Sequence, residues 1–483
     1  MEQTDEGYWV PEHVRAWLEG LGYALPLSAM EGHVRAWWRW MRALGDFYNY
    51  RDVDGAGRLY EVHRRSLHPV MRVCRGWGSL LLNDKTQIAC EDATCTEWLA
   101  EWADRTGFLP AAQDTVVRAF GLGTAAWALW VDAGSREVRV RSYDARMVVP
   151  LTWDGPDVTE CAFVTRVMWR GEPLDQVQLH VRGGRGAFGI EHAPGGDGAG
   201  MRGGAYRIVT ACFDKNGQEV RPEGVLPVYE TGSVWPTFSI VRPAIDNARA
   251  DCSPYGQSVF ADAVDAVQAV DLAFDAMVSE IDNGKMRVFL SDMLFDVEGE
   301  GGRRVSIPFG RRDCTVFRRV KSVEDVIQEF APTLRTGAQL QALRVALQML
   351  GDLCGLGIGY FDIDEHGRLK TATEVSSDNS ALMRNIRRHE HALERVLAGM
   401  AHALLAVARG LGEELPCEGR VRVGFDDSIV TDTAAEKAQD MAEVAAGLMQ
   451  PWEYRVRWYG EDEETARRAL LTEGGAKEPE LTA

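Results

Sequence analysis

The stretch Ser258–Ile281, SVFADAVDAVQAVDLAFDAMVSEI, has the pattern of one long amphipathic helix. Its apolar residues recur every three or four positions, which is the spacing of one face of an α-helix. At 1.5 Å per residue, such a helix would be about 36 Å long. A helix of this kind needs neighbours to cover its apolar side. The other side is acidic and carries Asp262, Asp265, Asp271, Asp275 and Glu280.

The next segment, from Lys285 to Lys321, is expected to form a small β-containing module. It holds nine Lys and Arg residues against five acids, although the whole chain has a net charge of −19. This local excess is consistent either with a solvated hairpin surface or with contact to an acidic protein surface or phosphate. Three arginine pairs stand out: Arg303-Arg304, Arg311-Arg312 and Arg318-Arg319.

Two further helices are predicted, the first from about Gly337 to Cys354 and a longer one from about Asp378 to Arg409. The segment between them, Gly355–Ser380, begins with spaced glycines and ends rich in Lys, Thr and Ser. Thr371–Val375 contains β-branched residues that disfavour a helix, so Ser376–Ser380 is expected to cap the longer helix. No S-x-x-K or G-x-S-x-G motif occurs here, so the serines are interpreted as caps and not as nucleophiles.

Residues 1–245 are predicted to form an α+β unit. Helical patterns cover Glu12–Gly22, Gly32–Tyr48, His63–Leu82 and Thr96–Thr106, and strand-like runs follow them. Lys215-Asn216-Gly217 has the composition of a hairpin turn between two of these strands.

A glycine-rich segment, Gly183–Gly204, interrupts the strands and contains a literal G-x-G-x-x-G at Gly184, Gly186 and Gly189. A dinucleotide site requires a helix to begin at that turn. Here more glycines, Pro194 and another strand follow instead. The segment is therefore interpreted as a loop, and no cofactor is expected.

The C-terminal part is predicted to run strand, helix, strand, helix, with the second strand at Tyr454–Gly460. Asp426, Asp427 and Asp432 supply oxygen ligands that a hard cation prefers. A turn and a helix cap explain them more simply, so no metal is expected. His389 and His391 diverge by about 200° around a helix and cannot share a metal, so they are interpreted as ordinary polar residues.

The composition is that of a folded chain without targeting signals. The pI of about 5.1 argues against a protein that grips DNA through phosphate contacts, but not against one that lets DNA slide past. Nine dispersed cysteines without a C-x-x-C pair indicate reduced thiols. No signal peptide and no apolar run of about 20 residues is present, so the chain is expected to be soluble and intracellular at synthesis.

Several separate segments, in this order, resemble the portal proteins of long-tailed double-stranded DNA bacteriophages. The resemblance covers most of residues 245–460, and is weaker from about 65 to 245. The matching segments are SPYGQSVFADAVDAVQAVDLAFDAMVSEI (Ser253–Ile281), EFAPTLRTGAQLQALRVALQMLGDLCGLGIGYFDID (Glu329–Asp364), KTATEVSSDNS (Lys370–Ser380) with RNIRRHEHALERVL (Arg384–Leu397), and VGFDDSIVTDTAAEKAQDMAEVAAGLMQPWEY (Val423–Tyr454).

The resemblance implies an α+β fold with phage portal architecture: an α/β wing, a helical stem, a small β-containing clip, a long kinked helix and a reduced helical crown. The implied divisions are wing 1–245, first stem helix 246–283, clip 284–322, second stem helix 323–355, tunnel loop 356–376, long kinked helix 377–411, wing return 412–460, and reduced crown and tail 461–483.

It also implies a structural protein and not an enzyme. Such proteins form a homo-oligomeric ring, a dodecamer in the virion, at one capsid vertex, after assembly in the host cytoplasm. Double-stranded DNA passes through the ring during packaging and ejection. The implied partners are the terminase packaging motor, a head-completion or adaptor protein, and the major capsid and scaffolding proteins, with no membrane.

The resemblance assigns roles to three sets of residues. The acidic stem residues Asp262, Asp265, Asp271 and Asp275 would line the channel and repel phosphate, and the six arginines Arg303, Arg304, Arg311, Arg312, Arg318 and Arg319 would bind partners. The tunnel loop would face the channel through Gly357, Gly359, Asp364, His366, Arg368, Lys370, Thr371 and Thr373.

Two alternatives stay open at the level of sequence. One is a metal-dependent nuclease that uses Asp426, Asp427 and Asp432. The other is a structural component of a capsid that is not a portal.

Overall fold

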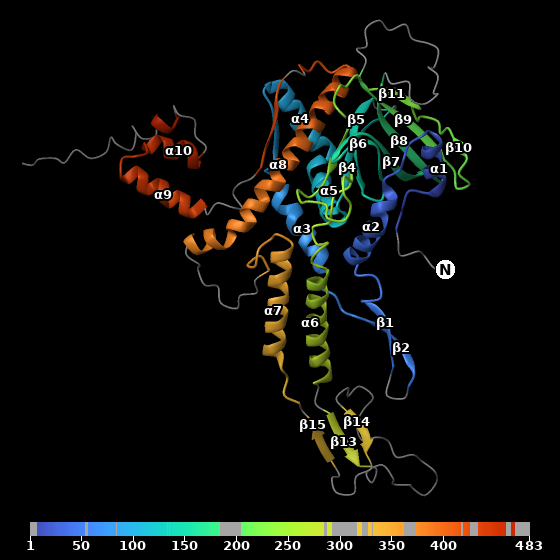
Figure 1. Cartoon of the computed structure of the whole chain (residues 1–483). Coiled ribbons are helices and arrows are strands. Elements are labelled where there is room, and N and C mark those ends of the chain that lie inside the picture. Colours follow the sequence, from blue (N-terminus) through green and yellow to red (C-terminus); the bar gives the residue numbers. More distant parts are fainter. Residues whose placement is uncertain are drawn as a thin grey trace, which may run out of the picture.

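The computed structural model shows a body of mixed helices and strands from which two helices descend to a small sheet (Figure 1). The α+β class expected from the sequence is confirmed. The residues that the structure describes are 7–53, 57–83, 85–132, 134, 136–183, 204–284, 287–291, 316–320, 327–330, 332–361, 372–416, 419–425, 433–459 and 465–468.

Five helices belong to the body. They are α1 (Glu12–Gly20), α2 (Leu27–Met41), α3 (Pro69–Leu81), α4 (Ala93–Thr106) and α5 (Phe108–Leu122).

Helices α2, α3 and α5 differ most from the sequence prediction. The helix predicted at Gly32–Tyr48 runs from Leu27 to Met41 instead. The predicted helix from His63 begins only at Pro69, because His68 has a left-handed backbone (φ 50°) and proline favours the first turn. No helix was predicted for α5. It is separated from α4 by a single residue, Gly107, whose φ of 62° ends one helix and starts the next.

Two antiparallel sheets complete the body. The larger has the strand order β10-β9-β8-β7-β6, with β11 also pairing β9, and the smaller has the order β12-β4-β5. The strands are β4 (Ala125–Asp132), β5 (Glu137–Asp144), β6 (Val148–Asp154), β7 (Asp157–Trp169), β8 (Glu172–Arg182), β9 (Tyr206–Phe213), β10 (Glu219–Val220), β11 (Val228–Glu230) and β12 (Phe238–Val241).

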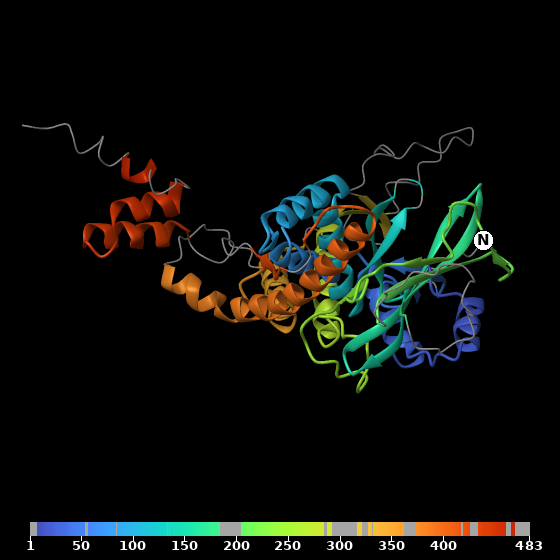
Figure 2. The ribbon, with the colours of Figure 1, turned by 90° about the horizontal axis from the view of Figure 1, so that it is seen from above.

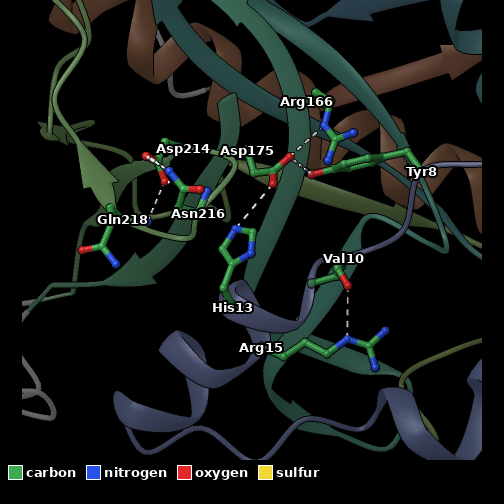
Figure 3. Close-up of polar contacts among 9 residues, drawn as sticks. All are labelled: Tyr8, Val10, His13, Arg15, Arg166, Asp175, Asp214, Asn216 and Gln218. Atoms are coloured by element: carbon green, nitrogen blue, oxygen red, sulfur yellow. Dashed lines mark hydrogen bonds and ion pairs between the residues drawn. The ribbon is translucent and has the colours of Figure 1, made fainter. Parts of the chain in front are cut away.

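The hairpin predicted at Lys215–Gly217 is confirmed between β9 and β10. Gly217 has a φ of 75°, which suits a tight turn. Asp214 accepts hydrogen bonds from the backbone N–H groups of Asn216 and Gln218, both at 2.8 Å (Figure 3).

The stem consists of α6 (Val264–Asn283) and α7 (Thr336–Leu353), which pack side by side (Figure 1). The prediction for α7 is confirmed, whereas α6 begins six residues later than expected. The residues Ser258–Ala263 form turns because Ser258 Oγ and the Val259 N–H both donate to the Phe120 carbonyl at the end of α5. These bonds hold the segment against the body before the helix starts.

A three-stranded sheet lies at the far end of the stem, as the β-containing module predicted there. Its order is β14-β13-β15, with β13 parallel to β14 and antiparallel to β15. The strands are β13 (Arg287–Ser291), β14 (Val316–Val320) and β15 (Ile327–Phe330).

The chain then returns to the body through α8 (Ala372–Gly410), a helix of 39 residues. The prediction of a non-helical Thr371–Val375 is wrong from Ala372 on, where α8 begins, and so is the prediction that Ser376–Ser380 forms a cap. β-Branched residues cost only tenths of a kcal/mol each in a helix, which continuation of a long helix outweighs. Strand β16 (Val421–Gly424) pairs with β3 (Gln87–Cys90) and ties the C-terminal part to the body.

Helices α9 (Thr433–Ala445) and α10 (Pro451–Tyr459) follow and lie to the side of α8 (Figure 2). The strand predicted at Tyr454–Gly460 is wrong for Tyr454–Tyr459, which belongs to α10. The helix brings Arg457 Nη1 and Trp458 Nε1 to the same carboxylate oxygen of Asp440 on α9, each at 2.8 Å. A strand would place these consecutive side chains on opposite faces.

Candidate functional site: the stem and its junction with the body

Helix α7 is apolar on two faces. One face is buried within the chain. The other face is exposed, and its apolar residues recur every four positions, as they would on a face that is covered. Met349 at its centre is 60% exposed. Helices with apolar residues on opposite sides are typically covered on both. The buried face carries Leu343, Leu347 and Leu350, and the exposed one Val345, Met349 and Leu353; α6 adds exposed Leu272 and Ile281.

An ion-pair cluster fixes the far end of the stem. Glu280 of α6 accepts hydrogen bonds from the Arg335 backbone N–H (2.7 Å) and Nε (3.1 Å), and from Gln339 Nε2 (2.8 Å). The hydrogen bonds from Arg335, with those from Gln339, lower the pKa of Glu280. The start of α7 is thereby held in register with the end of α6.

Asp271 contradicts its predicted place on an exposed acidic face. It is fully buried and accepts hydrogen bonds from Tyr48 Oη (2.8 Å), Ser66 Oγ (2.7 Å) and the Leu67 N–H (2.8 Å). Burial, followed by the charge of Asp271, raises the pKa of Tyr48, so the phenol stays protonated and donates. Asp271 therefore joins α6 to the chain before α3. Its partners lie more than 200 residues away in sequence, where no local pattern could reveal them.

The other three acids of the predicted face are not brought together as one unpaired surface. Asp262 lies in the turn before α6 and pairs with Arg249, and it also accepts from Gln257 Nε2 at 2.8 Å. Asp275 pairs with Arg65 Nη1 at 3.2 Å. Asp265 is exposed in the first turn of α6.

A β-hairpin beside the stem was not predicted. Strands β1 (Asn49–Val53) and β2 (Leu59–His63) pair in antiparallel register, and at the tip Val53 faces Leu59. Both are exposed, as is Tyr60 of the opposite face. The alternation of this segment is short and mixed with charges, so the helix-like pattern before it dominated the sequence interpretation. This hairpin, residues 49–63, is referred to below as the arm.

The exit from α7 is tight and not loose. Gly355 and Gly357 have φ values of 77° and 82°, and the N–H groups of Leu356 and Gly357 both donate to the Gly351 carbonyl. Trp77 Nε1 donates to the Cys354 carbonyl at 3.1 Å, and Asn385 Nδ2 to the Gly355 carbonyl at 2.9 Å. The glycines thus serve to turn the chain back against α3 and α8.

Much of the predicted tunnel loop and clip falls outside the described residues. Gly359 lies in the turn after α7, Thr373 in the first turn of α8, and Arg318 and Arg319 in β14. The residues that lie outside are Asp364, His366, Arg368, Lys370, Thr371, Arg303, Arg304, Arg311 and Arg312. The same holds for the glycine motif at Gly184–Gly189 and for Asp426, Asp427 and Asp432.

From the sequence, His389 is interpreted as an ordinary polar residue, and the structure contradicts this. It is buried, its ring lies edge-on to Trp77 (4.7 Å) and Phe120 (4.9 Å), and Nδ1 accepts from the Ala244 N–H at 3.0 Å. Burial, aided by Arg388, lowers its pKa to about 4. His389 is therefore a neutral core residue at the junction, whereas His391 is exposed.

A second buried carboxylate, Asp175, pins the N-terminal segment to the large sheet (Figure 3). It accepts from Tyr8 Oη at 3.1 Å and Arg166 Nε at 3.0 Å, and His13 Nε2 lies 3.4 Å away. Both carboxylate oxygens are occupied by side chains of the protein itself. The cluster is therefore explained as a structural connection.

A cleft of about 770 Å³ lies in the body between the loop before α6 and α8. Arg242, which lines it, donates to the backbone carbonyls of Pro156 and Pro254. Within the described ranges, no group of three or more His, Cys, Asp or Glu side chains is arranged to hold a metal ion, and no helix is long and apolar enough to cross a bilayer. The seven cysteines that are described are free thiols.

Comparison with known proteins gives structural likeness only. No family model matches this sequence, and no curated protein matches it. A chain from "Neck of empty GTA particle computed with C6 symmetry" matches with a TM-score of 0.40 at 13% identity, over 88% of this chain and 92% of that one. A chain from "Virion of native gene transfer agent (GTA) particle" has a TM-score of 0.38 at 14% identity, over 89% and 97%. At these values the likeness establishes neither the family nor the function.

Proposed function

We propose that this chain is the subunit of a portal ring at one vertex of a phage capsid, through which double-stranded DNA is packaged and ejected. The proposal is supported by the sequence resemblance and by the order of the elements: body, paired helices, small distal sheet, and a long helix back across the body. One observation carries it. The exposed apolar face of α7 requires a neighbour, and a ring of identical subunits supplies one on every stem.

The stem would form the wall of the channel. Of the acids first assigned to the lining, Asp265 is the one exposed in α6, while Asp271 is withdrawn from that role by its burial. A ring of subunits with a net charge of −19 each repels the phosphate backbone, so DNA is confined without being bound. Charge reversal at Asp265 is expected to slow DNA passage in a packaging reaction, and normal packaging would count against an acidic wall.

The remaining assignments belong to the same proposal. The tunnel loop, which includes Gly357 and Thr373, faces the channel. The three arginine pairs between residues 303 and 319 bind the packaging motor, and afterwards a head-completion protein. The major capsid and scaffolding proteins are further partners of the ring.

Imaging of the assembled protein tests the proposal directly. We expect the purified full chain to give ring-shaped particles with a central hole by negative stain, and a mass that is a multiple of 53.6 kDa. Met349→Glu places a charge on the exposed face of α7 and is expected to abolish the rings while leaving the circular dichroism of the chain unchanged. A chain that stays monomeric at all salt and protein concentrations, alone and with capsid and scaffolding proteins, contradicts the proposal.

A further inference from the structure

The arm is a two-stranded sheet with both faces largely uncovered. Among the described strands, β1 and β2 pair only with each other. Its polar positions are satisfied within the arm, since Asn49 Oδ1 and His63 Nδ1 lie 2.7 Å apart and Arg51 pairs with Glu61. Its apolar tip is not covered: Leu59 is 68% exposed. A lone hairpin is only marginally stable in water, so this one requires a partner.

The base of the arm is rigidly fixed to α6. Tyr48, directly before β1, and Ser66, soon after β2, both donate to the buried carboxylate of Asp271. Arg65 pairs with Asp275 (3.2 Å) and Asp282 (3.4 Å), one and three turns further along the helix. The direction of the arm is thereby set by the stem, so the arm presents its tip at a defined place.

The arm and α7 lie on opposite sides of α6. Asp271, Asp275 and Asp282, which bind the arm base, fall within about 40° of one another around the helix at 100° per residue. Glu280, which binds Arg335 before α7 and Gln339 in it, lies about 180° from Asp271. Figure 1 shows the same order across the stem, α7, α6 and then the arm, with the arm beside the distal part of α6.

We infer that the arm packs against the stem of the adjacent copy, where Leu59, Val53 and Tyr60 cover the exposed face of α7. The inference rests on the proposed ring. The two uncovered apolar surfaces lie at opposite edges of one layer across the stem: the arm tip at one edge, and the face of Val345, Met349 and Leu353 at the other. Two different surfaces that complement each other give head-to-tail contacts, which form a ring where the rotation between successive copies closes.

Cross-linking between positions 59 and 349 tests the contact. In a Cys252→Ser background, which removes an exposed native thiol, the double variant Leu59→Cys/Met349→Cys is treated with a short bis-maleimide. We expect a ladder of multimers on a denaturing gel that ends at the ring size, and no ladder for either single variant or the background chain. Rings that form normally but give no ladder overturn the inference and leave the proposed ring intact.

A matched pair of substitutions tests the energetics. Leu59→Ser is expected to raise the protein concentration needed for half-assembly by about ten- to hundredfold, because a buried leucine is lost from every contact. Met168→Ser, equally exposed at 68% but on the body, is the control and is expected to change it less than twofold. Equal effects of the two substitutions, or none from Leu59→Ser, overturn the inference. A wild-type chain without rings under any condition overturns the proposed function and this contact together.

Discussion

The body and the stem differ in how far their apolar side chains are buried within the single chain. In the body, large apolar residues such as Trp77, Trp127 and Phe163 are fully buried, and buried polar groups such as Asp175 have partners from the same chain. In the stem, Leu272, Met349 and Leu353 are more than half exposed. The body buries Trp77, Trp127 and Phe163 within a single chain, whereas in the proposed ring the exposed apolar residues of the stem would be covered by another copy. Substitutions in the two regions should therefore separate folding from assembly.

The largest effect is expected from Trp77→Ala. This side chain packs on Phe120 and His389 and donates to the Cys354 carbonyl, so its loss should reduce the free energy of unfolding by about 3–5 kcal/mol. Thermal unfolding by circular dichroism measures the change. The control is Trp235→Ala, since this tryptophan is 46% exposed. An equally large loss of unfolding free energy for Trp235→Ala would show that buried and exposed aromatic residues of the body contribute equally to its stability.

The next largest effect is a loss of folding stability at low pH, which arises from histidines in the body. His389 has its pKa lowered from 6.5 to about 4, so the folded protein binds this proton less readily than the unfolded chain. Stability should be full above pH 6.5 and fall by up to about 3 kcal/mol as the pH drops to 4. His180, whose burial lowers its pKa to about 3, acts in the same direction.

His389→Gln is the corresponding variant. It keeps an acceptor for the Ala244 N–H but does not titrate, so its melting temperature should depend less on pH between 6.5 and 4 than that of the wild type. Identical pH profiles would show that His389 is not the group responsible.

A smaller effect is expected at the boundary between the two regions. Asp271→Ala leaves the buried donors of Tyr48, Ser66 and Leu67 without an acceptor, which should cost about 2–3 kcal/mol. It should also increase the rate of protease cleavage within the arm. Asp265→Ala removes an exposed carboxylate and serves as control. Cleavage of the arm that is unchanged in Asp271→Ala would mean that the arm is held elsewhere.

The smallest effect on folding is expected from Met349→Ser. The side chain is 60% exposed in the single chain, so unfolding of the isolated chain should change by less than about 0.5 kcal/mol. Assembly, measured by sedimentation, should weaken clearly. A large loss of folding stability in a dilute, unassembled sample would contradict the assignment of Met349 to an assembly surface, because it would place this side chain in the core of the single chain.

Sequence periodicity was sufficient for the elements that repeat a single pattern over many residues. α7 and most of α6 were predicted correctly because their apolar spacing persists for five turns or more, and the turn at Lys215–Gly217 was found from its composition. The acidic residues of Ser258–Ile281 were also recognised, but the four assigned to the channel were treated alike. Only the fold distinguishes Asp271, buried under Tyr48, from exposed Asp265.

The failures share a physical cause, which is contact between distant segments. The late start of α6 depends on hydrogen bonds to Phe120, more than 130 residues earlier. His389 is buried by Trp77 and Phe120, which lie far from it in the chain. α10 is helical where an alternating pattern suggested a strand, because Arg457 and Trp458 meet one carboxylate of α9.

The tight exit from α7 has a mechanical consequence. Two side-chain donors, Trp77 Nε1 and Asn385 Nδ2, hold the successive carbonyls of Cys354 and Gly355. A pull along α7 therefore reaches α3 and α8 through these two bonds before it can stretch the segment that follows. The load is shared between an early and a late helix of the chain, so tension on the stem is converted into a displacement of the body and not into local unravelling.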